Sequence, residues 1–133
     1  MKFIIENEKL IGNLEFGALD ISPNAQVGYR PFELFVSSLT GCSGTLLRDI
    51  LVKKRQPYDK IEMEVSSIRN PDQANRIEQI SINALVYTEK PLSADQNDKI
   101  SKLVVKNCGM IQSVINCIEI VFTIKSTETT GDE

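Results

Sequence analysis

The feature that most constrains the fold of this chain is a long apolar segment that begins at Pro31. Its apolar residues recur every three or four positions, which predicts a helix over about residues 31–56 with one continuous apolar stripe. A proline fits the first turn of a helix, and Pro57 ends the segment. At 1.5 Å per residue, such a helix would be about 39 Å long and would form the central element of the domain. The predicted stripe comprises Phe32, Phe35, Leu39, Cys42, Leu46 and Ile50.

Apolar residues on the other sides of this helix indicate that the chain assembles with a second subunit. Val36, Leu47 and Leu51 widen the stripe, so the helix is predicted to be apolar over more than one face. A chain of 133 residues, one domain by its length, offers a single sheet of modest size to cover it. We therefore expect a second subunit to supply the missing cover in a two-fold homodimer. The opposite side is predicted to hold Glu33, Ser37, Thr40, Gly41, Gly44 and Arg48.

The remaining segments predict strands and shorter helical pieces. Ser93 and Gln96 form a capping box that opens a second helix, which runs to about Lys106. A break over 107–109 separates it from a further helical turn over 110–114. Strand and helix do not alternate regularly, so α+β is the better class. The domain is expected over residues 1–126, followed by a disordered polar tail over 127–133. Short strands are predicted over 2–5, 10–16, 60–65, 79–87 and 117–124.

Composition and charge exclude several classes of function. The net charge is −3 and the one basic cluster, residues 53–55, suits the negative end of the long helix, so nucleic acid is not an expected partner. No apolar run approaches the roughly 20 residues that span a membrane, and the first six residues do not form a signal peptide. A cytoplasmic protein with no membrane partner is therefore expected. The chain has no histidine, CxxC motif or phosphate-binding loop, so histidine catalysis, a metal site and a cofactor are not expected.

Two cysteines are the candidate reactive groups. Cys42 stands between Gly41 and Gly44 inside the helix, where glycine costs about 1 kcal/mol relative to alanine, so the backbone is bare near the sulfur. A free cysteine is often a small core residue, and this interpretation stays open beside that of a reactive thiol. Cys108 could simply end a helix, or the amides after Cys108 could stabilise its thiolate. Without histidine, only arginine, lysine, a helix N-terminus or backbone amides remain to lower a thiol pKa.

Four further residues have a structural and a functional interpretation. Glu33 is a favourable carboxylate in the first helical turn, or it orients an arginine. Arg30 is a solvated loop charge, or it is the cation that activates the reactive thiol. Arg48 lies on a different helical face from the cysteine and is expected to pair with Asp49 or another neighbour. Cys117 begins the last predicted strand and is expected to have only a packing role.

The segment from Arg30 to Cys42, Arg-Pro-Phe-Glu-Leu-Phe-Val-Ser-Ser-Leu-Thr-Gly-Cys, resembles the OsmC/Ohr family. In that family a proline and a glutamate open the central helix, and a cysteine follows about three turns later. A second cysteine lies near the start of a later helix, and Cys108 occupies that place in this chain. The order of elements agrees over about residues 1–125.

The resemblance implies an intertwined homodimer of α+β fold with active sites at the subunit interface. It implies a thiol-dependent, peroxiredoxin-like peroxidase of oxidative-stress defence: Cys42 would attack an organic hydroperoxide and become a sulfenic acid. Cys108 would then form a disulfide with it, and an external dithiol would reduce the pair. The family's activating arginine and glutamate correspond to Arg30 and Glu33 in this chain. Apolar residues at Phe32, Phe35 and Leu39 would favour alkyl or lipid hydroperoxides over hydrogen peroxide.

Three positions depart from the family pattern. Gly109 follows Cys108 where a proline is usual, and Glu33 stands one residue later than in the Ohr branch. Residues 1–29 contain no arginine, which leaves Arg30 as the substitute. An alternative function is therefore a catalytically weak member of the fold that binds an apolar small molecule at the dimer interface. A cation within reach of Cys42 would distinguish the two functions.

Overall fold

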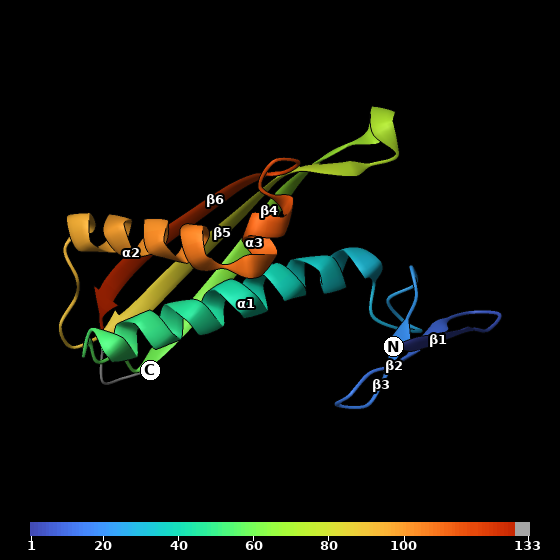
Figure 1. The fold of residues 1–133 in the computed structure, drawn as a ribbon, viewed down its shortest axis with the longest axis horizontal. Helices are drawn as coiled ribbons and strands as arrows, with labels where there is room; N and C mark the ends of the chain where they lie inside the picture. Colours follow the sequence, from blue (N-terminus) through green and yellow to red (C-terminus); the bar gives the residue numbers. More distant parts are fainter. Residues whose placement is uncertain (130–133) are drawn as a thin grey trace. The chain divides into compact units, whose positions relative to one another are not determined.

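The computed structural model describes residues 1–129, which form two compact units, Met1–Ser38 and the chain from Leu39 onward. Each unit contains a three-stranded sheet, and helix α1 (Pro31–Lys53) begins in the first unit and ends in the second (Figure 1). Separate sheets combined with helices confirm the predicted α+β class. Within residues 1–129, no helix combines the length and the apolar composition that crossing a membrane requires.

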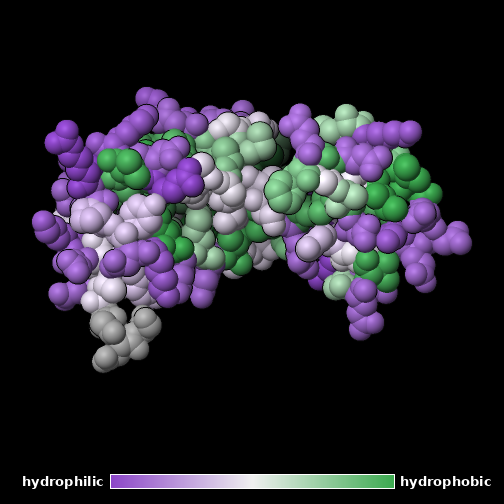
Figure 2. All heavy atoms as spheres, turned by 90° about the horizontal axis from the view of Figure 1, so that it is seen from below, coloured by the Kyte–Doolittle hydropathy of each residue, from purple (hydrophilic) through white to green (hydrophobic). Residues whose placement is uncertain are grey.

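The first unit contains an antiparallel sheet of three short strands, β1 (Lys2–Ile5), β2 (Leu10–Asn13) and β3 (Ala18–Ile21). The strand predicted over 10–16 ends at Asn13, because the chain turns there and returns as β3. In this turn the Leu14 N–H donates to the Gly17 carbonyl at 3.2 Å. Several large apolar side chains of the unit are exposed. Figure 2 shows green apolar surface at the right-hand end of the picture. They include Phe3, Ile4, Ile5 and Phe16.

The second unit is built on strands β4 (Lys60–Asn70), β5 (Arg76–Thr88) and β6 (Glu119–Glu128). Strands β4 and β5 form an antiparallel hairpin, with a 3-10 turn, η1 (Pro71–Gln73), in its loop. Strand β6 instead runs parallel to β5. A parallel neighbour requires a crossover connection, which is supplied here by α2 (Ala94–Asn107) and α3 (Gly109–Val114).

Two helix ends illustrate local sequence rules. The predicted capping box of α2 is confirmed: Ser93 Oγ accepts the Gln96 N–H at 3.2 Å, and Gln96 Oε1 accepts the Ser93 N–H at 3.1 Å. Helix α1 begins at Pro31 as predicted but ends at Lys53, three residues earlier than expected. Arg55 adopts a left-handed conformation with φ of 55°, and the Gln56 N–H donates back to the Leu51 carbonyl at 2.9 Å, which closes the helix end.

The last strand is longer than predicted. Residues 127 and 128 were expected in a disordered tail, but they pair with Tyr87 and Thr88 as part of β6. Strand β6 also begins at Glu119 rather than at residue 117. The rest of the expected tail, residues 130–133, lies outside the described residues.

The core lies between the helices and one face of the second sheet. Alternate residues of β5 are buried, namely Ile80, Ile82, Ala84 and Val86. The buried residues of α1 are Leu39, Ser43, Leu47 and Leu51. This set differs from the predicted stripe, because only Leu39 belongs to both. The other stripe residues, Phe32, Phe35, Cys42, Leu46 and Ile50, are half-buried. Ser43, with its small side chain, is fully buried in this line.

Two residues predicted on the polar side of α1 are in fact packed. A Cβ atom added to Gly44 would lie 2.8 Å from Met63 Sδ, so the glycine permits the close approach of α1 to β4. The Thr40 hydroxyl oxygen is also buried. The polar surface of α1 is therefore narrower than its sequence suggested.

Candidate functional site

Cys42 and Cys108 lie together in the second unit. Cys42 is half-buried on α1, and Cys108 is fully buried between α2 and α3. Their side chains share a hydrogen bond, and both are free thiols. The fold thus brings together two sulfurs that are 66 residues apart in the chain.

The junction of α2 and α3 gives Cys108 its position. Its N–H donates to the Val104 carbonyl at 2.9 Å and completes α2, while its carbonyl accepts the Gln112 N–H at 2.9 Å and begins α3. The extended backbone of Cys108, with φ of −81° and ψ of 112°, separates the two helices. The first amides of α3, those of Gly109, Met110 and Ile111, have no partner within the helix and are available to other acceptors.

These amides influence the ionisation of Cys42. The Met110 N–H is the main influence that lowers the pKa of Cys42, and the Cys108 side chain and the Gly109 N–H add to it. Partial burial opposes them but does not reverse the direction. Each of these donors stabilises the thiolate relative to the thiol.

Cys108 has the opposite electrostatic character. Burial raises the pKa of Cys108, and its hydrogen bond and charge interaction with Cys42 raise it further, although the Ile111 and Met110 amides lower it in part. The opposite directions of the two pKa shifts make Cys42 the thiol of the pair that ionises more readily.

The two glycines near Cys42 have different roles. A Cβ atom at Gly41 would meet nothing within 4 Å, so this position leaves open space beside the cysteine. Gly44 instead lies against Met63, because a Cβ atom there would be 2.8 Å from the Sδ atom of this flexible side chain. Leu46, one turn after Cys42, is half-buried and offers apolar surface on the same side of α1. Leu39, expected to line the approach to the thiol, is only 2% exposed and belongs to the core.

Arg30 and Glu33 belong to the first unit. They form an ion pair with each other at 3.8 Å, and their side chains are 46% and 58% exposed. The structure therefore supports the predicted association of the arginine with the glutamate. Their action on Cys42 stays a prediction.

The remaining predicted residues have structural positions. Arg48 pairs with Asp49 at 3.3 Å, as predicted. Cys117 is exposed in a turn, where its N–H donates to the Val114 carbonyl at 2.9 Å, and it precedes β6 by two residues. Among the described residues, no cluster of three or more histidine, cysteine or acidic side chains is placed to hold a metal ion.

The sequence predicts the amides after Cys108 as donors to a Cys108 thiolate, whereas in the structure the amides of Met110 and Gly109 lower the pKa of Cys42. The sequence signal for these amides is Gly109, which lies in the predicted break after the second helix and is the first residue of α3. That their acceptor is Cys42 depends on how α1 packs near the α2–α3 junction.

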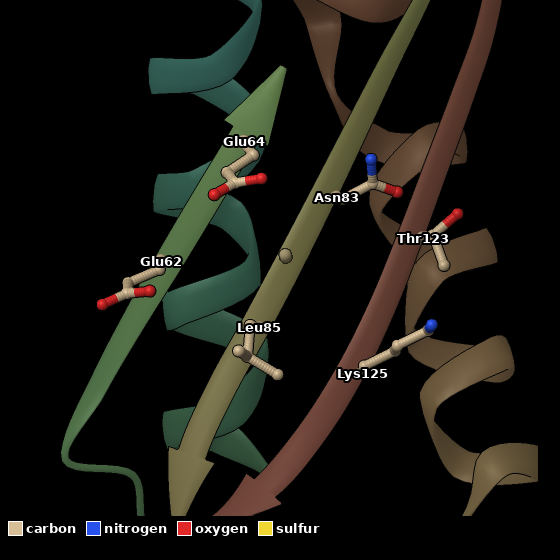
Figure 3. Close-up of a pocket in the computed structure, with 7 residues that line it drawn as sticks. Glu62, Glu64, Asn83, Leu85, Thr123 and Lys125 are labelled. Atoms are coloured by element: carbon tan, nitrogen blue, oxygen red, sulfur yellow. The ribbon is translucent and has the colours of Figure 1, made fainter. Parts of the chain in front are cut away.

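A hollow with a volume of about 230 Å³ lies on the exposed face of the β4–β6 sheet, away from the cysteines. Figure 3 shows side chains of opposite charge across it: Glu62 and Glu64 stand on β4 and Lys125 stands on β6. Lys60 pairs with Glu62 at 2.8 Å, and this contact lowers the pKa of the glutamate. The hollow contains neither cysteine.

Comparison with known proteins agrees with the fold. A family model described as OsmC-like protein matches residues 23–123. Among solved structures, a hypothetical protein from Aquifex aeolicus VF5 has a TM-score of 0.84 at 18% identity, covering 97% of this chain and 96% of that one. An OsmC-like protein from Mycoplasma pneumoniae has a TM-score of 0.76 at 15% identity, covering 98% and 99%.

The organic hydroperoxide resistance protein OhrB of Bacillus subtilis has a TM-score of 0.62 at 16% identity, covering 93% of this chain and 96% of that one. At these identities the likeness establishes a common fold. A search of curated protein sequences gives no significant match.

Proposed function

Because this chain belongs to the OsmC-like protein family, we propose that it is a thiol-dependent peroxidase that reduces organic hydroperoxides in oxidative-stress defence. The observation that carries this proposal is the contact between Cys42, whose pKa is lowered, and the buried thiol of Cys108. A peroxidatic thiol must react as the thiolate, and it needs a second thiol nearby to escape further oxidation. The name of the OhrB neighbour, an organic hydroperoxide resistance protein, supports the same activity.

The proposed reaction has two steps within the protein. The Cys42 thiolate attacks the terminal oxygen of the hydroperoxide, the O–O bond breaks, and the alkoxide leaves as the alcohol after taking the Cys108 proton. This step produces a sulfenic acid on Cys42 and a thiolate on Cys108. The Cys108 thiolate then attacks the Cys42 sulfur, hydroxide leaves and is protonated to water, and a disulfide results. An external dithiol reduces this disulfide by exchange and becomes oxidised itself.

The surroundings of Cys42 favour an organic substrate. Leu46 presents half-buried apolar surface one turn from the sulfur, and Gly41 leaves space beside it. An alkyl group can bury apolar area there, whereas hydrogen peroxide has none to bury. We therefore expect cumene hydroperoxide to be reduced faster than hydrogen peroxide.

The test is a peroxidase assay with cumene hydroperoxide and several dithiols, followed by peptide mass spectrometry of the oxidised protein. We expect peroxide consumption that depends on the dithiol, with Cys42 linked to Cys108 and Cys117 still free. The Cys117→Ser protein is the control and should retain turnover. If no peroxide is consumed and all three thiols survive, the protein is instead a binder of apolar small molecules.

We further propose that the protein is a homodimer. Val52 on α1 is 62% exposed, and Leu46 and Ile50 on the same helix are only half-buried. In the first unit, Ile5 is 81% exposed and Phe16 is completely exposed. Large exposed apolar side chains are typical of an interface, and an obligate interface would bury about 2,000 Å² or more. Sedimentation should give the mass of a dimer in dilute solution, and a folded monomer would contradict the proposal.

A further inference from the structure

The hollow on the exposed face of the β4–β6 sheet is bordered by four polar side chains that the fold itself does not use. Glu64, Asn83 and Thr123 are neighbours in the strand register and form one row across β4, β5 and β6. Lys125 follows Thr123 by two residues and stands on the same face of β6 (Figure 3). Within residues 1–129, none of these four side chains takes part in a hydrogen bond or an ion pair. They are therefore available to a molecule that enters the hollow.

The two charges of this set lie on opposite sides of the hollow. Glu64 stands on β4 and Lys125 stands on β6, with β5 between them, and both side chains are exposed. Neighbouring strands lie about 4.8 Å apart, so β4 and β6 are separated by about 10 Å. Figure 3 shows the Lys125 ammonium directed away from β4, and the flexible stem of a lysine lets this group turn back over the sheet. A ligand that joins the two side chains must carry a cation for Glu64 and an anion for Lys125.

The other carboxylate at the hollow is already engaged. Glu62 pairs with Lys60 at 2.8 Å and accepts the Tyr87 O–H at 3.2 Å. These contacts neutralise its charge and hold it at the β4 side of the sheet. Glu64 is thus the carboxylate that remains for the cationic group of a ligand.

The floor of the hollow offers both polar and apolar contacts. The Asn83 amide can donate and accept hydrogen bonds, and the Thr123 hydroxyl can do the same. Leu85 adds an apolar side chain beside them on β5. The volume of about 230 Å³ is smaller than the roughly 300–1,000 Å³ of sites that hold drug-sized molecules. The hollow therefore suits a small ligand with two opposite charges and a short apolar part.

We propose that this hollow binds a free amino acid. The ammonium group of the ligand would lie at Glu64 and Asn83, and its carboxylate would lie at Lys125 and Thr123. An apolar side chain of the ligand would contact Leu85. The site is separate from the proposed thiol chemistry, because the hollow contains neither cysteine.

The first test uses the natural chain and three related probes. Leucine carries both charges, N-acetyl-leucine keeps only the carboxylate, and leucine amide keeps only the ammonium group. Millimolar leucine should shift the amide NMR signals around Asn83 and Thr123 to saturation, and each analogue should bind at least about fivefold more weakly. Equal binding of leucine and either analogue, or no shift at the hollow, would overturn the proposal.

The second test removes each charge of the protein in turn. Glu64→Gln and Lys125→Gln change exposed side chains without internal partners in the described structure, so the fold should be kept. Each variant should bind leucine about fivefold more weakly. The matched control is Glu119→Gln, which removes an exposed carboxylate of β6 that lies outside the hollow and should leave binding unchanged.

Two results of this second test would refute the site. One is unchanged leucine binding in either hollow variant, and the other is an equal loss in the Glu119→Gln control. Neither test uses peroxide, so a failed peroxidase assay leaves this proposal standing or falling on its own measurements.

Discussion

Replacing Cys42 by serine is expected to abolish the reduction of cumene hydroperoxide by this protein. A hydroxyl is nearly the same size as the thiol, but it does not ionise near neutral pH and cannot be oxidised to a sulfenic acid. Loss of a covalent nucleophile should lower turnover on the order of 10³-fold or more, to the rate of the dithiol alone. The measurement is dithiol-dependent peroxide consumption at saturating reductant.

The control for this result is Cys117→Ser, which removes an exposed thiol that has no contact with the reactive pair. This variant should keep normal turnover, whereas Cys42→Ser should be folded but inactive. Circular dichroism and thermal unfolding establish whether each variant is folded. Substantial turnover by folded Cys42→Ser would assign the chemistry to another group and remove the basis of the proposed function.

Replacing Cys108 by serine is expected to stop the reaction after one oxidation. The serine hydroxyl can still donate a hydrogen bond to Cys42, so the first attack on peroxide should proceed. No disulfide can follow, and the sulfenic acid should persist or advance to sulfinic acid. Each subunit should therefore consume about one equivalent of peroxide rapidly and then stop, because the resolving thiol is missing.

Mass spectrometry distinguishes the outcomes for Cys108→Ser. The expected product carries one or two added oxygen atoms on the Cys42 peptide, and excess peroxide should increase the sulfinic form. Normal turnover of this variant with a dithiol would mean that the external thiol reduces the sulfenic acid directly. The two-cysteine mechanism would then be wrong, while Cys42 would remain the nucleophile.

Local sequence rules predicted those parts of the fold that depend on neighbouring residues. Pro31 begins α1, and Ser93 with Gln96 opens α2, because first-turn proline and the capping box act within a few residues. The alternation of β5 predicted its buried face, since one side of the strand is consistently apolar. The pairing of Cys42 with Cys108 came from the family resemblance, because spacing alone cannot connect positions so far apart.

Features that depend on tertiary packing were beyond such rules. Helix α1 is apolar on several sides, so periodicity could not choose between the predicted stripe and the line through Ser43 and Leu47. Strand β6 continues through Thr127 and Glu128 because backbone pairing with β5 does not require apolar side chains. The donors to Cys42 were missed for the same reason: Met110 acts through its amide, which no side-chain pattern reveals.

The placement of the two cysteines on distant segments has a consequence for the unfolded chain. A disulfide between Cys42 and Cys108 would enclose β4, β5 and α2 in one covalent loop. Closing a loop of this length would stabilise the folded state by up to roughly 4 kcal/mol, chiefly by restricting the unfolded ensemble. The reduced form would then unfold more readily than the form with the disulfide. Proteases and chaperones would accordingly act mainly on the reduced molecules.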